Sequence, residues 1–448
     1  MTTGTPYSDT YWSEREIWSR DQTAAFQLDA LKRQMAYVGE RSDYYRTVFG
    51  QAGFDPRDLK SLDDLRQLPM TRKRDYVSAI PTAAPWGPFL ACDPADIRRI
   101  HFSSGTTGKP AHMCWTEPDV ERWADLFARY FYAQGIRKGD VMQLMVGFAW
   151  FVGGLGLAMA ARKLGAALIP AGNGDSQRQI TTLMDYGVTA AFATSSFAAH
   201  LSEVAAEMGV DLRNSPLKRM LVGGEPGGGI EGTRRRIEET WGADTYDCYG
   251  MIEFQPTAWE TQAKDGLVLA EDFVFAEVLD PATDQPVPDG TPGVLVLTHL
   301  DKQACPLVRW WTGDMVVRDS RPSADGRTFA RLIGGVQGRA DDMLVIRGVN
   351  VFPSSIEEVI RAIPGVGTEY QIVLDDSLLD GAGFLTGIRL RAEVESGDGE
   401  ALAKVVADTI RQKLTIRAKV DLVAKGTLPR AMHKAQRVVK QFGGTADS

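Results

Sequence analysis

The chain has 448 residues, of which 44% are hydrophobic, and its 50 Lys and Arg residues nearly balance its 58 Asp and Glu residues. A net charge of -8 creates no general field that would attract nucleic acid or an anionic membrane, so neither is expected as a partner. The length favours a large body of several lobes with a smaller domain, rather than a single core.

The N-terminal sequence MTTGTPYSDTYWSERE is polar and acidic, and it does not read as a signal peptide. Four cysteines are scattered along the chain without a CxxC pair. This spacing argues against a disulfide framework and a zinc ribbon, and it favours a reducing, cytoplasmic setting. The cysteines are Cys92, Cys114, Cys248 and Cys305.

A loop rich in glycine and hydroxyl groups, HFSSGTTGKP, begins at His101. Gly105 and Gly108 let the backbone turn and aim N–H groups at an anion, and Lys109 adds a positive charge, so the loop suits a polyphosphate. It is not a Walker loop, because only two residues separate the glycines and Pro110 stands where Ser or Thr would bind magnesium. For a shorter fragment, a plain hairpin turn would be the simpler interpretation.

Residues 144–161, LMVGFAWFVGGLGLAMAA, carry no charge and just reach the length of a membrane helix. Glycines interrupt the segment, Arg162 and Lys163 end it, and no aromatic or basic residues flank it as they flank a membrane span. A buried strand, a turn and a core helix are therefore predicted here.

From about residue 140, apolar runs alternate with helical stretches, a pattern that predicts crossover units on a parallel sheet covered by helices on both faces. The predicted strands are VMQLMVGF, AALIP, TAAFAT and KRMLVGG, and the predicted helices lie near 153–165, 176–186, 196–208 and 230–241. Gly224, Glu225 and Pro226 follow the last of these strands, at the end where parallel sheets usually bind ligands.

Between about 265 and 335 the pattern changes to strand pairs broken by the turn sequences DPATDQPVPDG and DSRPSADG, which predicts a β-rich subdomain. The charged run GRADD follows near 340, then one predicted strand, MLVIRGV, and a helix that opens at Pro353. The last hundred or so residues are therefore predicted to form a small α+β domain.

Eight motifs resemble, in order and at about the same spacing, those of the phenylacetate-CoA ligase family. This family is part of the adenylate-forming superfamily of acyl-CoA synthetases, luciferases and adenylation domains. The motifs are LDDLRQLPMTRKRDY, RIHFSSGTTGKP, FVGGLG, GGEP, YGMIE, VRWWTGDM, GRADDMLVIRGVNVFPSSIEEV and LPRAMHKAQRV, and they cover about residues 30–440.

The resemblance implies an α/β fold: a large N-terminal body of several subdomains with mostly parallel sheets and a β-rich subdomain, plus a small mobile α+β C-terminal domain. Residues 1–339 would form the adenylation domain and residues 340–448 the C-terminal domain, with Asp341 as the hinge. The implied reaction activates a carboxylic acid with ATP as an acyl-AMP, releases pyrophosphate and transfers the acyl group to coenzyme A. A carrier-protein thiol or an amine as acceptor, and a non-catalytic relative, stay open.

The resemblance also implies a role for each matching residue. Ser103, Ser104, Gly105, Thr106, Thr107, Gly108 and Lys109 would wrap the phosphates of ATP. Gly224, Glu225, Pro226, Asp247, Cys248 and Tyr249 would line the adenine pocket, and Gly250 is a further ATP-binding candidate. Asp314 would accept the ribose hydroxyls, Arg339 would contact ribose or phosphate, Glu253 would bind magnesium, and Lys434 would neutralise charge during adenylation. Without the motifs, Lys434 would be one surface lysine among several, and Glu253 a surface carboxylate after a strand.

The acid is expected to be aromatic, like phenylacetate or a benzoate. Phe148, Trp150 and Gly223 are the candidates for its pocket, because aromatic walls and a glycine floor suit a flat ring; ordinary core packing is the alternative. Some family members carry a Cys and His cluster after the magnesium glutamate. The stretch from Glu260 to Val268 has neither residue type, so no zinc is expected, and Cys305 and His299 are interpreted as core residues. The oligomeric state is not fixed by the sequence.

Overall fold

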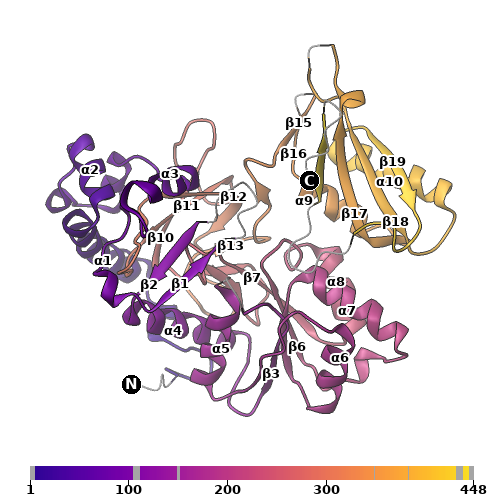
Figure 1. Ribbon diagram of the computed structural model, residues 1–448, viewed down its shortest axis with the longest axis horizontal. Coiled ribbons are helices and arrows are strands. Elements are labelled where there is room, and N and C mark those ends of the chain that lie inside the picture. The colour runs from indigo at the N-terminus through magenta and orange to yellow at the C-terminus, as the bar shows by residue number, and fades with distance from the viewer. Residues whose placement is uncertain are drawn as a thin grey trace. The chain divides into compact units, whose positions relative to one another are not determined.

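The computed structural model describes residues 6–103, 111–148, 152–347, 349–381, 383–429 and 437–442. Two compact units make up the chain. The first comprises Met1–Gly172, Val188–Ala191 and Tyr246–Gly335, and the second comprises Asn173–Gly187, Phe192–Thr245 and Val336–Ser448. In the first unit, the N-terminal helices therefore lie beside strands from the third quarter of the sequence (Figure 1).

A run of antiparallel strands forms one half of the first unit, in the order β10-β11-β12-β13-β9-β8-β7. Strand β11 is buried at every position but its first, so both faces of this sheet are covered. The strands are β7 (Asp244–Tyr249), β8 (Ala258–Glu260), β9 (Leu267–Leu269), β10 (Val274–Leu279), β11 (Pro292–His299), β12 (Trp310–Asp319) and β13 (Arg331–Leu332).

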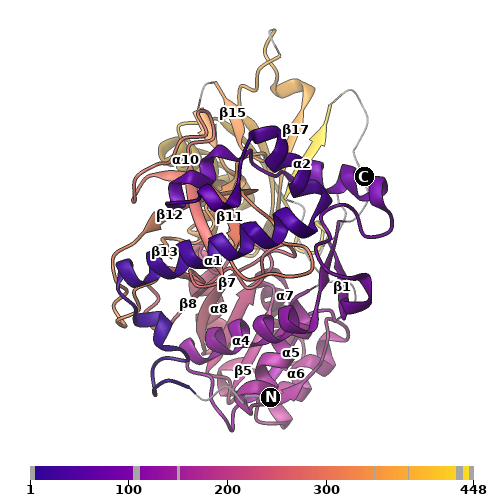
Figure 2. The ribbon, with the colours of Figure 1, turned by 90° about the vertical axis from the view of Figure 1, so that its left-hand side faces the viewer.

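Helix α1 (Arg20–Arg41) provides part of that cover, as Figure 2 shows. It buries Leu31, Met35 and Val38, which recur at helical spacing and so form one face. The amide of Gln27 donates to the backbone oxygens of Glu271 and Val274 at the start of β10. Two shorter helices, α2 (Asp43–Ala52) and α3 (Lys73–Ala79), follow α1 in the same unit.

The other half of the first unit holds the crossover elements that the apolar runs predict. Strands β3 (Val141–Leu144) and β4 (Ala167–Ile169) are parallel, and β5 (Ala190–Ala193) follows them along the chain. Helices α4 (Glu117–Ala133) and α5 (Gly153–Leu164) pack closely, because a Cβ atom on Gly156 of α5 would lie 2.5 Å from the ring of Trp123 of α4. The hairpin of β1 (Arg99–Phe102) and β2 (His112–Trp115) precedes α4.

The second unit begins with the helices α6 (Ser176–Asp185), α7 (Ser195–Glu207) and α8 (Glu231–Trp241) and the buried strand β6 (Arg219–Gly223). Its later part is a four-stranded sheet in the order β19-β18-β17-β20, with α9 and α10 packed on it. These later elements are β14 (Gly338–Arg339), β15 (Leu344–Ile346), β16 (Val349–Val351), α9 (Pro353–Arg361), β17 (Val366–Asp375), β18 (Ile388–Val394), α10 (Gly399–Leu414), β19 (Ala418–Val423) and β20 (Val438–Gln441).

The predicted fold class is confirmed, and the predicted strands and helices between 141 and 241 match β3 to β6 and α5 to α8 to within a few residues at each end. The prediction of one strand at MLVIRGV is wrong. Arg347 has φ 51°, so the chain reverses there and forms the antiparallel pair β15 and β16. The domain boundary after residue 339 stays a prediction.

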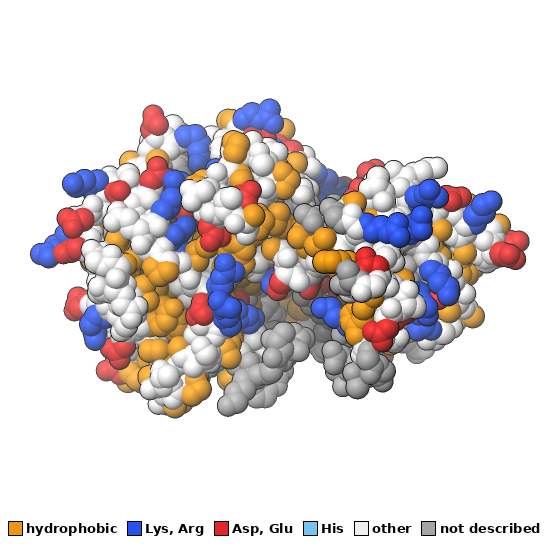
Figure 3. All heavy atoms as spheres, turned by 90° about the horizontal axis from the view of Figure 1, so that it is seen from above, with side chains coloured by type: hydrophobic (Ala, Val, Ile, Leu, Met, Phe, Trp, Pro, Cys, Tyr) orange, Lys and Arg blue, Asp and Glu red, His pale blue; other side chains and the backbone are white. Residues whose placement is uncertain are grey.

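The segment that just reaches membrane length contributes the end of β3 and most of α5 to the first unit. Among the described residues, no helix is both long and apolar enough to span a bilayer. On the face shown in Figure 3, Lys and Arg side chains are interspersed with Asp and Glu, as the nearly balanced composition predicts.

Candidate active site

The predicted phosphate loop connects the two strands of the β1–β2 hairpin, whose last paired residues are Phe102 and His112. At the base of the loop, the N–H of Ser103 donates to the oxygen of Ala111 at 2.8 Å, and the N–H of Ala111 donates to Oγ of Ser103 at 3.0 Å. Tyr76 of α3 donates to the oxygen of His112 at 2.7 Å. The hydroxyl of Ser103 thus helps to close the hairpin and can still donate its own proton.

Most of the loop itself lies outside the described residues. Ser104, Gly105, Thr106, Thr107, Gly108 and Lys109 belong to this part, as do Trp150 and Lys434. Their roles in binding phosphate, the acid or the developing charge stay predictions. What the structure gives for the loop is its hydrogen-bonded base, with the buried strand β2 on one side and the partly exposed strand β1 on the other.

Asp314, the predicted ribose carboxylate, lies in β12 and contacts Tyr249 at the end of β7. The hydroxyl of Tyr249 donates to Oδ2 of Asp314 at 2.6 Å. The N–H of Asp314 donates to the hydroxyl of Thr312, and the intervening Gly313 has φ 80°, a conformation that favours glycine. Two predicted nucleotide residues, 65 positions apart in sequence, are therefore held in direct contact.

The residues before Tyr249 are fixed by hydrogen bonds within the first unit. The N–H of Asp247 donates to Oε2 of Glu260 at 2.8 Å, and Oδ1 of Asp247 accepts from the N–H of Cys248 at 2.9 Å. Gly250 leaves room for a neighbour, because a Cβ atom there would lie 2.9 Å from Cγ of Gln255. The predicted adenine-binding stretch is therefore a rigid strand end followed by a tight turn.

Glu253, the predicted magnesium ligand, follows this turn, and its side chain is only 4% exposed. Its Oε1 is enclosed and makes no hydrogen bond, whereas Oε2 is not enclosed in this way. The ammonium of Lys73 lies 3.4 Å from Oε1. A carboxylate with one open oxygen fits a magnesium site of the kind in which substrate phosphates and water supply the other ligands.

Among the described residues, no group of three or more His, Cys, Asp or Glu side chains is placed to hold a metal ion. A single carboxylate is nevertheless the protein ligand that a metal shared with polyphosphate needs. The donor set around Glu253 therefore fits magnesium bound together with a nucleotide.

Phe254 and His299 hold the backbone beside Glu253. Their rings stack with centroids 3.9 Å apart. Burial lowers the pKa of His299 well below its ordinary value, and the nearby ammonium of Lys302 lowers it further, so the ring is neutral. Nδ1 of the neutral ring accepts from the N–H of Leu307 at 3.0 Å. The interpretation of His299 and Cys305 as core residues agrees with their burial.

Thr71 to Lys73 form a strap along the edge of this site that the sequence analysis missed. The N–H of Thr71 donates to the oxygen of Arg309, and Thr71 in turn accepts from the N–H of Trp311, both at 2.9 Å. The guanidinium of Arg72 lies 4.3 Å from the ring centroid of Trp311, and Lys73 faces Glu253. The motif LDDLRQLPMTRKRDY contains the strap, but only the folded chain shows which carboxylate it reaches.

In the second unit, the predicted adenine residues Gly224, Glu225 and Pro226 follow the buried strand β6, which ends at Gly223. Oε1 of Glu225 accepts from the N–H of Ser196 at 2.6 Å, in the first turn of α7. The following Gly227 fits closely, because a Cβ atom there would lie 2.1 Å from Oγ of Ser195. The Glu225 side chain therefore ties this loop to the start of α7.

Phe148, a candidate for the acid pocket, is half-buried after β3. A Cβ atom on Gly154 would lie 3.1 Å from the Phe148 ring and 2.7 Å from the oxygen of Gly147, so glycine is required for the ring to lie across the start of α5.

At the predicted hinge, Arg339 and Asp341 form a bidentate ion pair with two distances of 2.9 Å. Both side chains are exposed, which fits a hinge better than a core position.

The chain is similar to known proteins over nearly its whole length. Residues 52–299 match the family model of AMP-binding enzymes, and residues 348–441 match that of the AMP-binding enzyme C-terminal domain. The phenylacetate-coenzyme A ligase of Thermus thermophilus is 35% identical over 94% of this chain and 97% of its own length. That of Escherichia coli is 32% identical over 94% and 96%, respectively.

A similar solved structure is that of 2-hydroxyisobutyryl-CoA ligase in the postadenylation state, in complex with 2-HIB-AMP. It is 32% identical, covers 97% of this chain and 93% of its own, and superposes with a TM-score of 0.92. The same enzyme with 2-HIB-AMP and CoA in the thioesterification state gives a TM-score of 0.74, over 98% and 94% of the two chains.

Proposed function

Because the chain belongs to the phenylacetate-coenzyme A ligase family of AMP-binding enzymes, we propose that it joins a carboxylic acid to coenzyme A through an acyl-adenylate. The protein is an AMP-forming acid–thiol ligase that uses ATP and coenzyme A. The observation that carries this function is the match along nearly the whole length of these ligases. The contacts of Tyr249 with Asp314 and of Lys73 with Glu253 support it.

In the first half-reaction, an oxygen of the substrate carboxylate attacks the α-phosphorus of ATP, and the bond to the pyrophosphate oxygen breaks. The loop from Ser103 to Lys109 would hold the β- and γ-phosphates. Asp314 accepts the ribose hydroxyls, oriented by Tyr249, and Asp247 to Gly250 flank the adenine. Magnesium, when bound at Glu253, supplies positive charge to the phosphate oxygens. Lys434 adds a positive charge near the reacting carboxylate.

In the second half-reaction, the thiol of coenzyme A attacks the acyl carbonyl, AMP leaves with the electron pair of the mixed anhydride, and the thiol proton passes to solvent. The two half-reactions need different groups around one intermediate. Arg339 and Asp341 form the hinge at which the C-terminal part changes position between them. The exposed ion pair of these two residues supports this role, because an exposed pair breaks at little energetic cost.

The acid is an aromatic one of the phenylacetate or benzoate class. The half-buried ring of Phe148 beside the glycine-rich start of α5 supports a flat substrate. Trp150 and Gly223 stay the other candidates for contact with the acid. The 2-hydroxyisobutyryl-CoA ligase and the phenylacetate-coenzyme A ligase of Escherichia coli are both 32% identical to this chain. A branched hydroxy acid is therefore the competing substrate class to be tested against aromatic acids.

The function is tested by acid-dependent release of pyrophosphate from ATP, with phenylacetate, benzoate, hydroxybenzoate, aminobenzoate and 2-hydroxyisobutyrate, each with and without coenzyme A. One aromatic acid should stimulate release, and its CoA thioester should appear by mass spectrometry. Release of pyrophosphate without a thioester would mean that the acyl acceptor is a carrier-protein thiol or an amine rather than coenzyme A. Preference for 2-hydroxyisobutyrate would overturn the aromatic assignment, and no release with any acid would overturn the ligase function.

A further inference from the structure

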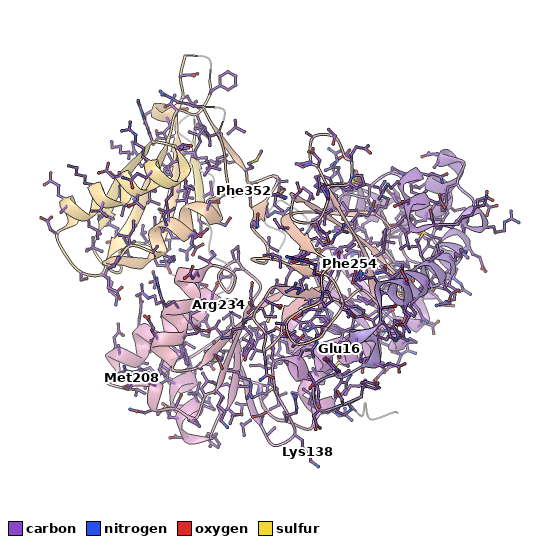
Figure 4. The ribbon with its side chains drawn as sticks, turned by 180° about the vertical axis from the view of Figure 1, so that it is seen from behind. Glu16, Lys138, Met208, Arg234, Phe254 and Phe352 are labelled. Carbon is purple, nitrogen blue, oxygen red and sulfur yellow. The ribbon has the colours of Figure 1, made fainter. Side chains whose placement is uncertain are left out.

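A small cavity lies inside the first unit, and Glu253 is one of the residues that line it. Side chains from α4, from the turn after β7 and from the end of β11 line it, among them Trp123, Glu253, Gln255 and His299. Figure 4 marks this place by Phe254, which lies between two of the lining residues in sequence and is fully buried. The cavity has room for about one water molecule.

Three enclosed polar atoms on the lining residues make no hydrogen bond within the described part of the chain. They are Nε1 of Trp123, Oε1 of Glu253 and Oε1 of Gln255. An enclosed polar atom without a partner destabilises a fold, so three such atoms on residues that line one cavity are not expected unless something joins them. Trp123 and Glu253 are almost completely buried, so bulk solvent does not serve them.

The charges around the cavity decide which molecule it takes. Lys302 lines it, and its ammonium already donates to Oδ2 of Asp119 and to the oxygen of Cys114, both at 2.9 Å. This ammonium and the N–H of Trp123 repel a cation. The carboxylates of Asp119 and Glu253 repel an anion. The occupant must therefore be neutral.

The three atoms without a hydrogen bond also fix the hydrogen bonds of the occupant. Trp123 offers one donor, and Glu253 and Gln255 offer one acceptor oxygen each. A molecule that accepts one hydrogen bond and donates two satisfies all three atoms at once. Water does this, and three hydrogen bonds is the usual number for a buried water.

We propose that one ordered water in this cavity bridges Trp123, Gln255 and Oε1 of Glu253, and that Trp123 and Gln255 are thereby positioning residues for the metal-binding carboxylate. The water and Lys73 hold Oε1, so the open Oε2 faces the metal in one fixed orientation. The role in metal binding rests on the proposed function. The water site itself rests only on the three atoms and the cavity.

A crystal structure of the whole chain at a resolution that shows ordered water tests the site directly. Density for one water within hydrogen-bond distance of the three atoms is expected in the wild type and is expected to be absent from Trp123→Phe. An empty cavity in the wild type, or closure of the cavity by direct contacts among the three side chains, would overturn the proposal.

The positioning role is tested by binding of Mn²⁺ in the presence of ATP, followed by electron paramagnetic resonance without an acid substrate. Trp123→Phe and Gln255→Met each remove one partner of the water, and each should weaken Mn²⁺ binding about tenfold, the usual effect of removing an outer partner of a metal ligand. The double variant should bind Mn²⁺ about as tightly as the weaker-binding single variant, because both substitutions act through one water.

Trp259→Phe is the matched control, because its Nε1 is also enclosed and unpaired but does not line the cavity. It should leave Mn²⁺ binding unchanged. If Trp123→Phe does not fold, Gln255→Met decides alone. Unchanged Mn²⁺ binding in Gln255→Met would overturn the positioning role, while pyrophosphate release by the wild type would still support the ligase function. Wild-type protein that binds no Mn²⁺ with ATP would overturn the role of Glu253 instead.

Discussion

Two buried carboxylates line the same cavity and differ in how they are satisfied. Asp119 is 2% exposed at its side chain and accepts from Lys302, from the N–H of Gln303 at 2.8 Å and from the N–H of Ala304 at 3.0 Å. Glu253 is 4% exposed and has only Lys73 beside it, 3.4 Å from an oxygen without a hydrogen bond. Equal burial therefore coexists with very different hydrogen bonding.

The difference separates a carboxylate that stabilises the fold from one that is kept available for a ligand. Burial raises the pKa of Asp119, but the charge of Lys302 and the backbone donors outweigh it and hold the pKa below its ordinary value. A fully satisfied carboxylate of this kind has no capacity left for a metal. Glu253 keeps that capacity, and the fold must tolerate its incomplete bonding.

Asp119→Asn should have the largest effect on stability, because it leaves the ammonium of Lys302 buried without a counter-charge. The free energy of unfolding should fall by about 3–5 kcal/mol, measured by urea titration with tryptophan fluorescence. The double variant Asp119→Asn with Lys302→Met should recover much of the loss, since no charge is then left buried. A double variant as unstable as the single one would contradict the ion-pair explanation.

Glu253→Gln should lower activity and leave stability nearly unchanged, in contrast to Asp119→Asn. Acid-dependent pyrophosphate release should fall about 100-fold, which corresponds to about 2.7 kcal/mol in the reaction barrier, because the charge that binds magnesium is lost. The urea midpoint should stay near that of the wild type, because Lys73, the cation beside Glu253, is half-exposed and stays hydrated when its counter-charge is lost. Unfolding of this variant under assay conditions would identify Glu253 as a structural residue.

Asp272 extends the comparison to acid pH. Burial raises its pKa, but the charge of Arg129 and its two hydrogen bonds, at 2.7 and 2.9 Å, outweigh burial and hold the pKa at about 2. This stability is complete above the unfolded pKa of about 3.9 and is lost as the pH falls towards 2. It amounts to about 2.5 kcal/mol.

The measurement is urea unfolding between pH 5 and pH 2. The wild type should lose more stability over this range than the double variant Arg129→Met with Asp272→Asn, which lacks the ion pair. Equal pH dependence of the two proteins would exclude Asp272 as a source of acid sensitivity.

The smallest effect is expected at the surface. Asp301 pairs with Arg122, but its side chain is 50% exposed, and water and salt screen the pair. Asp301→Ala should change the free energy of unfolding by less than about 1 kcal/mol in the same urea titration. A loss as large as that of Asp119→Asn would mean that burial does not separate the two kinds of carboxylate.

The arrangement of strands and helices between 141 and 241 could be predicted because each apolar run is short and is bounded by polar turns, and because β3, β5 and β6 are largely buried. The β15–β16 hairpin could not be predicted, since the apolar pattern of MLVIRGV suits one strand and the reversal depends on the backbone of Arg347. The pairing is local, between residues 344–346 and 349–351, and an apolar pattern does not record where a chain turns.

The candidate site likewise has a part that could be predicted from the sequence and a part that could not. The motifs identified Tyr249, Glu253 and Asp314, and their resemblance to a family supplied roles that no spacing could have given. Contacts between distant residues were not accessible from the sequence. Lys73 and Glu253 are 180 positions apart, and only the pairing of Thr71 with Arg309 and Trp311 brings the strap to the site. The side chain of Glu225 likewise serves the start of α7 in addition to any ligand.

The N-terminal segment of the first unit has its partners near residues 270–330, and this has a consequence for synthesis on the ribosome. Arg327 completes the ion pair of Glu16, 311 positions earlier, and Glu271 completes the contacts of Gln27 in α1. At about 5–20 residues per second, α1 waits roughly 15–60 s for these partners. Its apolar face of Leu31, Met35 and Val38 is uncovered during that time, so nascent chains shorter than about 330 residues should be natural clients of a chaperone.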